Sequence, residues 1–422
     1  MLARRPSSCG RRLEPARAFA GALVLTLLGA GCARPDPKPL RGAASARPAA
    51  VSAASAPRPR PPPDTPAPSP EPVASVVNEE RLDAGLPGLR LGELAEVGPA
   101  GPATAFGGGA ALVSKDDRLV VTRLAANTPV AQAKLSAIEE PASAFAPLGR
   151  GPSVAGGAAY WVSNGRLVRR ALAPEAPLEV LSEDARTSTR TSAAEIDGKA
   201  VVAYLGKPDA EGTAHARLWI EGGTSLDLTP DGAGASSVAL ARHGNGLLAV
   251  AIDGRSAMTP LHARKLTFKD GRPELAADVV TWVGGPAQTW TEIVLGSSRG
   301  RAFAHLPIER DVTHFGLATI DVGEEPRMDS NVSFFDYPNG LDLAPAAAVE
   351  LCGKSYLSFA RPIGSVPHSP QELVLAEAGG SRATVVANGR GFASVSLASA
   401  PRGGLIVYVA DRRTWALGLA CD

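Results

Sequence analysis

A short glycine-containing pattern recurs along most of the chain, and it constrains the fold more than any other feature. Each copy is a turn with glycine followed by a run of small or β-prone residues, as in Gly246-Leu-Leu-Ala-Val. The copies begin at Gly109, Gly157, Gly198, Gly246, Gly300, Gly353 and Gly404. Successive glycines lie 41 to 54 residues apart. A repeat of this length predicts seven copies of one supersecondary unit.

Residues 235–283 show what one unit contains. Four short strands are expected there, separated by the turns Gly244-Asn245-Gly246 and Lys269-Asp270-Gly271 and by one loop. The expected strands are Ala235–His243, Leu247–Ile252, Leu261–Phe268 and Pro273–Trp282. Four strands in a unit of about 50 residues are typical of one blade of a β-propeller. An array of β-sandwiches would need a longer period, and a β-solenoid usually has a shorter one.

The two ends of the repeat region complement each other. The last unit has three expected strands, Ala393–Ala398, Leu405–Ala410 and Thr414–Ala420, while an additional strand, Gly88–Val97, precedes the first unit. Pairing that strand with the last unit completes seven sets of four strands and removes exposed sheet edges. Residues 80–422 therefore resemble an all-β, seven-bladed β-propeller of four-stranded antiparallel blades, with the last blade completed by an N-terminal strand. The motifs of WD40, kelch and quinoprotein propellers are missing, so no specific family follows.

Residues 1–32 have the layout of an export signal. Five arginines precede a 13-residue apolar run, Ala18–Ala30. The run is shorter than the roughly 20 residues that span a bilayer. It ends in Leu28-Gly29-Ala30-Gly31-Cys32, which resembles a bacterial lipobox, although Gly29 stands where that motif usually has leucine. The resemblance implies lipidation at Cys32, with simple cleavage or an uncleaved anchor as alternatives, and Ala33 after the cysteine implies transfer to the outer membrane.

Residues 33–78 are expected to form a disordered tether. They contain 13 prolines mixed with Ala, Ser and Arg. Proline removes backbone donors and fixes φ, so the segment should sample extended conformations and hold the following domain away from a membrane. A proline-motif ligand for a partner protein is the alternative.

Net charge differs between these segments. The chain has 43 Lys and Arg against 42 Asp and Glu, but residues 1–32 carry +4, residues 33–78 carry +3, and the remainder carries −6. A mildly acidic main body argues against nucleic acid as a partner, because such binding needs a basic surface.

Two cysteines, Cys352 and Cys421, fall in the expected propeller. An exported domain permits a disulfide between them. The Cα atoms would have to lie within about 7 Å, which the sequence does not establish, so two separate cysteines near strand ends are the alternative.

Motifs that carry enzymatic chemistry are mostly absent. Gly296-Ser297-Ser298-Arg299-Gly300 matches the G-x-S-x-G pattern of hydrolases, but it falls in an expected strand-to-strand hairpin rather than a strand-to-helix turn. We therefore interpret it as structural. No catalytic residue, cofactor or metal site is predicted.

One face of the expected propeller carries the candidate binding residues. It bears the loops between second and third strands, which are long in units three to six, and the connections between units. The candidates on that face are His215, His262, Trp290, Arg310, His314, Asp336, Tyr337, His368 and Arg390. Common descent of the repeats is the alternative explanation for His215-Ala-Arg217 and His262-Ala-Arg264.

These features together predict an exported, lipid-anchored propeller that acts as a non-catalytic binding or scaffold module at the bacterial envelope. Its expected partners are the membrane, through the lipid, and an envelope protein or glycan. A propeller enzyme, either a hydrolase or a lyase with its site at the central channel, is one alternative. A carboxylate pair, or a histidine with a carboxylate, at the channel mouth would favour it. A purely structural envelope protein is the other alternative.

Overall fold

The computed structural model describes most of the chain after residue 84. The described residues are 75–76, 85–123, 131–132, 138–142, 144–145, 151–253, 260–282, 293–298, 301–309, 314–322, 328–338, 346–363, 370–378, 382–400 and 402–422. The chain divides into two units, residues 1–67 and 68–422, and every described residue belongs to the second. The residues of the predicted signal, Cys32 and most of the predicted tether therefore lie outside the described residues.

The described strands form seven sheets, confirming the all-β prediction of mainly four-stranded antiparallel sheets. The first contains β3 (Ala103–Phe106), β4 (Ala110–Lys115), β5 (Arg118–Arg123), β6 (Ala131–Gln132) and β7 (Ile138–Pro141). The second contains β8 (Ser153–Ala155), β9 (Ala158–Ser163), β10 (Arg166–Ala171) and β11 (Leu178–Ser182). The third contains β12 (Ser192–Ile196), β13 (Lys199–Leu205), β14 (Ala216–Ile220) and β15 (Thr224–Asp227).

The remaining four sheets continue in the same order along the chain. The fourth contains β16 (Ser237–His243), β17 (Gly246–Ile252), β18 (Pro260–Lys269), β19 (Arg272–Leu275) and β20 (Val279–Trp282). The fifth contains β21 (Val294–Ser298), β22 (Arg301–Glu309), β23 (His314–Val322), β24 (Met328–Pro338) and β1 (Ser75–Val76). The sixth contains β25 (Ala346–Leu351), β26 (Lys354–Pro362), β27 (Gln371–Glu377) and β28 (Ala383–Gly389). The seventh contains β29 (Ser394–Ala400), β30 (Gly403–Ala410), β31 (Arg413–Cys421) and β2 (Leu89–Pro99).

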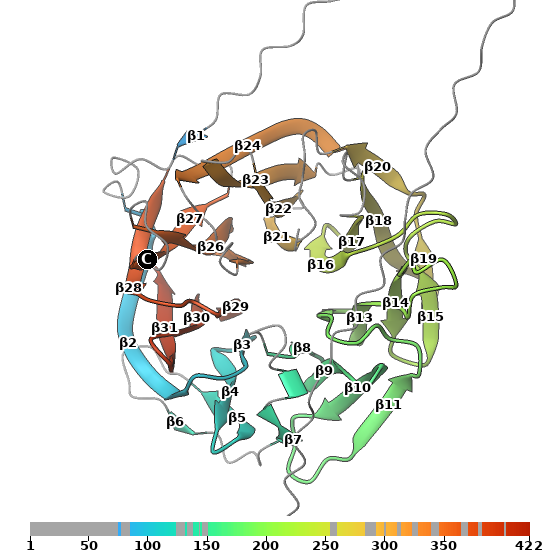
Figure 1. Cartoon of the computed structure of the whole chain (residues 1–422), viewed down its shortest axis with the longest axis horizontal. Coiled ribbons are helices and arrows are strands. Elements are labelled where there is room, and N and C mark those ends of the chain that lie inside the picture. Colours follow the sequence, from blue (N-terminus) through green and yellow to red (C-terminus); the bar gives the residue numbers. More distant parts are fainter. Residues whose placement is uncertain are drawn as a thin grey trace, which may run out of the picture. The chain divides into compact units, whose positions relative to one another are not determined.

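The sheets of this unit surround a central axis in a propeller-like arrangement (Figure 1). The strand nearest the axis is an edge strand of each sheet, and these strands are β3, β8, β12, β16, β21, β25 and β29. Each of these innermost strands contacts the next in chain order, and β29 contacts β3. Because neighbouring strands are antiparallel, the third strand of each sheet starts at the end where the innermost strand starts. We call this end the entry face.

The seventh sheet, here called the closing sheet, joins the two ends of the domain. β2, which corresponds to the expected strand Gly88–Val97, pairs with β31 so that Leu89 lies opposite Cys421, with two register shifts along the pair. The Asp422 backbone N donates to the Gly88 carbonyl at 3.2 Å. A disulfide joins Cys352, in the β25–β26 turn, to Cys421, with the Cα atoms 5.7 Å apart. The sixth and closing sheets are therefore linked covalently.

The second strand of a sheet is apolar on both faces because its alternating side chains contact two neighbouring sheets. In β13, Val201, Ala203 and Leu205 pack with the fourth sheet, whereas Ala200, Val202 and Tyr204 pack with the second. Successive residues of a strand point to opposite faces, so a strand between two other sheets has to be apolar throughout. The run Gly246–Ile252 is fully buried for the same reason.

The repeated glycines have two different structural roles. Gly109, Gly157, Gly198 and Gly353 adopt positive φ between 68° and 73° in the turn before the second strand. Gly246 and Gly404 lie at close contacts instead. A Cβ on Gly246 would lie 2.4 Å from the Leu266 carbonyl oxygen, and one on Gly404 would lie 2.5 Å from Leu351 Cδ2. One sequence pattern thus marks both a turn and a packing restriction.

Two sequence-based boundaries differ from the structure. The expected fourth strand Pro273–Trp282 is divided into β19 and β20, and both pair with β18. β1 falls inside the segment predicted to be a tether, and it pairs in parallel with β24. The last proline of that segment is Pro72, so Ser75 and Val76 retain the backbone N–H groups that a strand needs. Within the described ranges, no helix is long and apolar enough to cross a membrane.

Candidate functional site

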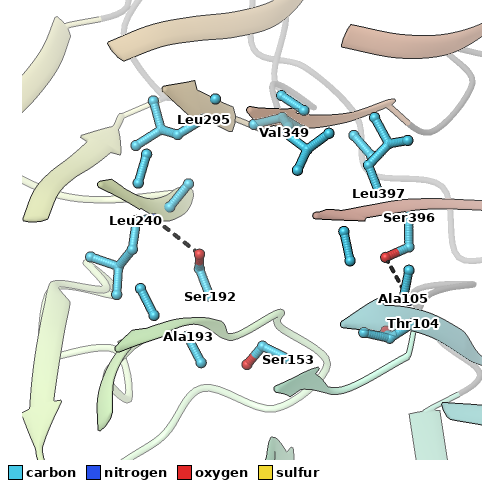
Figure 2. Close-up of a pocket in the computed structure, with 18 of the residues that line it drawn as sticks. Thr104, Ala105, Ser153, Ser192, Ala193, Leu240, Leu295, Val349, Ser396 and Leu397 are labelled. Carbon is cyan, nitrogen blue, oxygen red and sulfur yellow. Dashed lines mark hydrogen bonds between the residues drawn. The ribbon is translucent and has the colours of Figure 1, made fainter. Parts of the chain in front are cut away.

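A cavity of about 660 Å³ runs along the axis and is lined by residues from the innermost strand of every sheet. Figure 2 shows side chains from these strands arranged around it, among them Thr104, Ser192, Leu240 and Ser396. Most of the wall consists of Ala, Ser, Val, Leu and Gly. Small residues are expected there because seven strands converge on one axis. The wall thus offers short apolar and hydroxyl side chains to anything inside the cavity.

Serine side chains of the wall connect neighbouring sheets. The Leu240 backbone N donates to Ser192 Oγ at 3.0 Å, and the Ala105 backbone N donates to Ser396 Oγ at 3.0 Å (Figure 2). Ser237 Oγ accepts a similar bond from the Ile293 backbone N at 3.1 Å. Each serine thus satisfies an amide at the innermost strand of the next sheet. These hydroxyls therefore stabilise the ring, and each has one of its acceptor positions occupied.

Charged groups are few in the described lining of the axial cavity. They are Arg190, Arg242 and Glu350, and that lining contains no histidine. General acid–base chemistry usually needs two titratable groups in mutual reach. A single carboxylate without a histidine does not supply such a pair. Among the residues that the structure describes, no group of three or more His, Cys, Asp or Glu side chains could hold a metal ion.

A second cavity of about 400 Å³ opens beside the axial one on the entry face, and we call it the mouth pocket. It is lined by residues 140–141, 144–145, 151–152, 161–164 and 187–191. Gly151, Pro152, Arg190 and Thr191 line both cavities. On the described part of the entry face, the mouth pocket therefore adjoins the axial cavity and is formed by the first and second sheets and the connection to the third.

The wall of the mouth pocket contains two packed aromatic residues. Phe145 meets Trp161 edge-on, with ring centroids 5.2 Å apart and an angle of 63° between the planes. Trp161 is only 3% exposed, and its Nε1 is buried with no hydrogen-bond partner in the described part of the chain. A buried donor without an acceptor is costly, so such groups are uncommon in folded proteins. This donor distinguishes Trp161 from an ordinary core tryptophan.

Hydroxyl groups surround the rest of the mouth pocket. The Thr191 hydroxyl donates to the Tyr160 carbonyl at 2.9 Å, and Thr189 donates to the Arg186 carbonyl at 2.7 Å. The hydroxyls of Ser163, Thr187 and Ser188 have no such bond within the described residues. The pocket also contains one cation and one anion, Arg190 and Glu140. The lining thus combines aromatic, hydroxyl-bearing and oppositely charged side chains.

Of the sequence-predicted candidates, only His215, His262 and Arg390 have described side chains, and none of these three lines either cavity. His215 Nε2 lies 3.1 Å from Asp209 Oδ2, in the loop before β14. The Asp209 carboxylate also accepts the backbone N–H of Thr213 at 2.7 Å. The hydrogen bond from the Thr213 N–H contributes most to lowering the pKa of Asp209 below its ordinary value, and the hydrogen bond with His215 contributes next. His215 thus helps to order its own loop.

His262 has a similar partner in a different place. Its Nδ1 lies 2.8 Å from Asp278 Oδ2, and both side chains are largely buried, at 8% and 16% exposure. Asp278 precedes β20, so this contact connects two strands of the fourth sheet. The two His-Ala-Arg sequences therefore have different surroundings, although their positions in the repeat match. Neither histidine lines a described cavity.

The other predicted residues have varied placements. Arg390 is exposed, and its backbone exchanges hydrogen bonds with Asp411 in the β30–β31 turn. His314 starts β23 opposite Pro338, next to Asp336 and Tyr337 in β24, so the backbone places these three at one end of the fifth sheet. Trp290, Arg310 and His368 lie outside the described residues.

Sequence reasoning missed the mouth pocket although two signals were present. Residues 187–192 read Thr-Ser-Thr-Arg-Thr-Ser, a hydroxyl-rich connection between units. Trp161 ends the apolar run of the second unit, where the sister runs end in Val, Ala, Leu or Tyr. The long loops drew the prediction to units three to six, whereas the described hollow lies over units one and two.

No protein-family model and no curated protein matches this sequence. Several solved structures align with it in part. A mutant of the Aleuria aurantia lectin in complex with α-methyl-L-fucoside has 12% identity over 63% of this chain and 88% of its own, with a TM-score of 0.38. A putative TolB from Agrobacterium tumefaciens has 14% identity over 64% and 89%, with a TM-score of 0.36. A mutant of AofleA from Arthrobotrys oligospora has 10% identity over 75% and 94%, with a TM-score of 0.39. Because these scores and identities are low, none of the three contributes to the functional argument.

Proposed function

We propose that this protein is an exported, lipid-anchored binding module of the bacterial envelope. In this proposal, residues 80–422 form a seven-bladed β-propeller, residues 33–78 tether it, and lipid on Cys32 holds it at the outer membrane. The seven sheets, the contacts between successive innermost strands and the closing sheet support the propeller. The Cys352–Cys421 disulfide supports export, because disulfides persist in oxidising compartments.

The observation that carries the binding role is the pair of adjoining cavities, the axial cavity and the mouth pocket. Its two cavities of about 660 and 400 Å³ fall within the range of roughly 300–1,000 Å³ that is usual for small-molecule pockets. The described lining of the axial cavity has one carboxylate and no histidine, which gives the enzyme alternative no acid–base pair to build on. A rigid scaffold with loops around a cavity is a common basis for recognition. The partner on this proposal is an envelope protein or glycan.

Two experiments test the two parts of the proposal. Full-length protein and a Cys32→Ser variant are expressed in a Gram-negative host, and their membrane fractions are compared. The wild type should stay with membranes and take up labelled palmitate, whereas the variant should lose the label and leave the membrane. Equal fractionation without label would reject the lipid anchor.

A pull-down from envelope extracts with immobilised protein tests binding, and failure to enrich any envelope protein or glycan would reject the binding module.

A further inference from the structure

The aromatic side of the mouth pocket suits a ligand that has C–H groups and acceptors on the same molecule. Trp161 and Phe145 line the pocket with only 3% and 6% of their surface exposed, and their T-shaped contact holds both rings in place. Trp161 Nε1 adds a single buried donor that the described chain leaves unpaired. An acceptor on a ligand within reach of this N–H would satisfy it. A purely apolar ligand would leave this donor unpaired.

The hydroxyl groups of the mouth pocket suit a ligand that both donates and accepts. Ser163, Thr187 and Ser188 line the pocket, and each hydroxyl has one donor and two acceptor positions. Their bonds are not committed within the described chain, unlike those of the serines in the axial wall. Hydroxyls that can adopt either role match partners that are themselves hydroxyls. An ion would instead call for several side chains of one charge.

The charges in the pocket point to an uncharged ligand. Arg190 contributes donors and Glu140 contributes acceptors, so the two formal charges cancel. We propose that the mouth pocket binds a neutral saccharide of one or two pyranose rings, with a C–H face toward Trp161 and Phe145. Its hydroxyls contact the hydroxyl-bearing connection 187–191. This inference rests on the proposed binding function and names the ligand class of that site.

Isothermal titration calorimetry of the purified protein with defined sugars tests the inference. The probes are the methyl α-glycosides of glucose, mannose and galactose, N-acetylglucosamine and its β-1,4-linked dimer. At least one probe should bind with a Kd of about 1 mM or tighter. Trp161→Phe keeps an aromatic ring but removes Nε1–H, and it should weaken that probe about tenfold. Trp219→Phe is the matched control, because Trp219 is also buried but lies outside the pocket, and it should change the Kd less than about twofold.

A second variant keeps the test decisive if Trp161→Phe fails to fold. Thr187 is exposed at the pocket, so Thr187→Trp should fold and fill it, abolishing sugar binding. Binding by none of the probes would overturn the inference, as would equal affinities of the Trp161→Phe and Trp219→Phe variants. The proposed function is judged separately. If the pull-down still enriches an envelope component while no sugar binds, the binding module stands and the saccharide assignment fails.

Discussion

The closing sheet and the mouth pocket use similar polar residues for opposite purposes. In the closing sheet, Ser396 accepts the Ala105 amide, and the Thr414 hydroxyl donates to the Pro99 carbonyl at 2.6 Å. Arg413 pairs with Glu96, and the disulfide fixes Cys421. In the mouth pocket, Trp161 Nε1 and the hydroxyls of Ser163 and Thr187 have no partner in the described chain. Paired polar groups stabilise the ring, whereas the hydroxyls of Ser163 and Thr187 have hydrogen-bonding positions left for a ligand.

This difference shows why residue type alone is a poor guide to function in a repeat protein. Serine and threonine occur in both regions, but position decides whether a neighbouring sheet already uses the hydroxyl. Substitutions in the closing sheet should therefore reduce stability, whereas substitutions at the pocket rim should affect binding with little loss of stability. Four changes test this distinction.

Removal of the disulfide should have the largest effect on stability. It closes a loop with a sequence separation of 69 residues. The chain-entropy relation for a loop of that length gives about 4 kcal/mol. The double variant Cys352→Ser, Cys421→Ser should therefore unfold at clearly lower denaturant concentration, as measured by circular dichroism. An unchanged midpoint would show that the closing sheet does not depend on this link.

Alkaline pH should have the second-largest effect on stability, through the closing sheet. Burial, and then the negative charge of Asp411, raise the pKa of Tyr408 to about 12. The pKa in the unfolded chain is about 10. The folded state holds the proton of the Tyr408 hydroxyl more tightly than the unfolded chain does, and this difference stabilises the fold. The stabilisation is complete below about pH 10 and is lost as the pH rises through 12. The loss is at most about 2 to 3 kcal/mol.

Tyr408→Phe removes the titrating group and serves as the control for this pH effect. Unfolding free energies measured between pH 9 and pH 12 should fall more steeply for wild type than for the variant. Parallel curves would show that the Tyr408 hydroxyl does not contribute to the pH dependence.

Ser396→Ala should have a smaller effect. The variant leaves the Ala105 amide without its acceptor at 3.0 Å, in a part-buried position between two sheets. Loss of such a bond costs about 1 to 2 kcal/mol. Denaturant unfolding should show this decrease without a change in sugar binding. If Ser396→Ala instead abolished binding and left stability unchanged, the wall serines would belong to the site.

Thr187→Ala should change stability least. Thr187 is exposed at the mouth pocket, and its hydroxyl has no bond within the described chain. Surface substitutions of this kind usually change stability by less than about 0.5 kcal/mol. The same unfolding assay should show this small change, while titration should show weaker binding of the sugar. A stability loss as large as that of Ser396→Ala would remove the contrast between the two regions.

Most of the strand pattern could be predicted from sequence because strand periodicity and turn glycines are local signals. β16, β17 and β18 match the expected strands of the fourth unit within two residues at each end. The partner of β2 was also predictable, because counting strands in the last unit left one place empty. The break between β19 and β20 was not predictable. At this break Asp278 contacts His262, sixteen residues earlier in the chain, and such a contact is not a local signal.

The site was harder to predict because its properties depend on contacts between sheets. The histidines shared a repeat position, yet His215 and His262 are paired with local carboxylates and lie away from both cavities. Trp161 became notable only when its indole nitrogen proved to be buried without an acceptor. The sequence shows neither burial nor hydrogen-bond pairing. Those two properties separate the mouth pocket from the closing sheet.

Indole N–H resonances offer the most direct test of the central claim that the mouth pocket is the binding site. In a ¹⁵N-labelled domain, the signal that disappears in Trp161→Phe identifies the Trp161 indole. On addition of the sugar that binds in titration, we predict that this signal moves progressively and to saturation. The corresponding signal of Trp219 should stay in place. A sugar that binds while the Trp161 signal does not move would contradict the account.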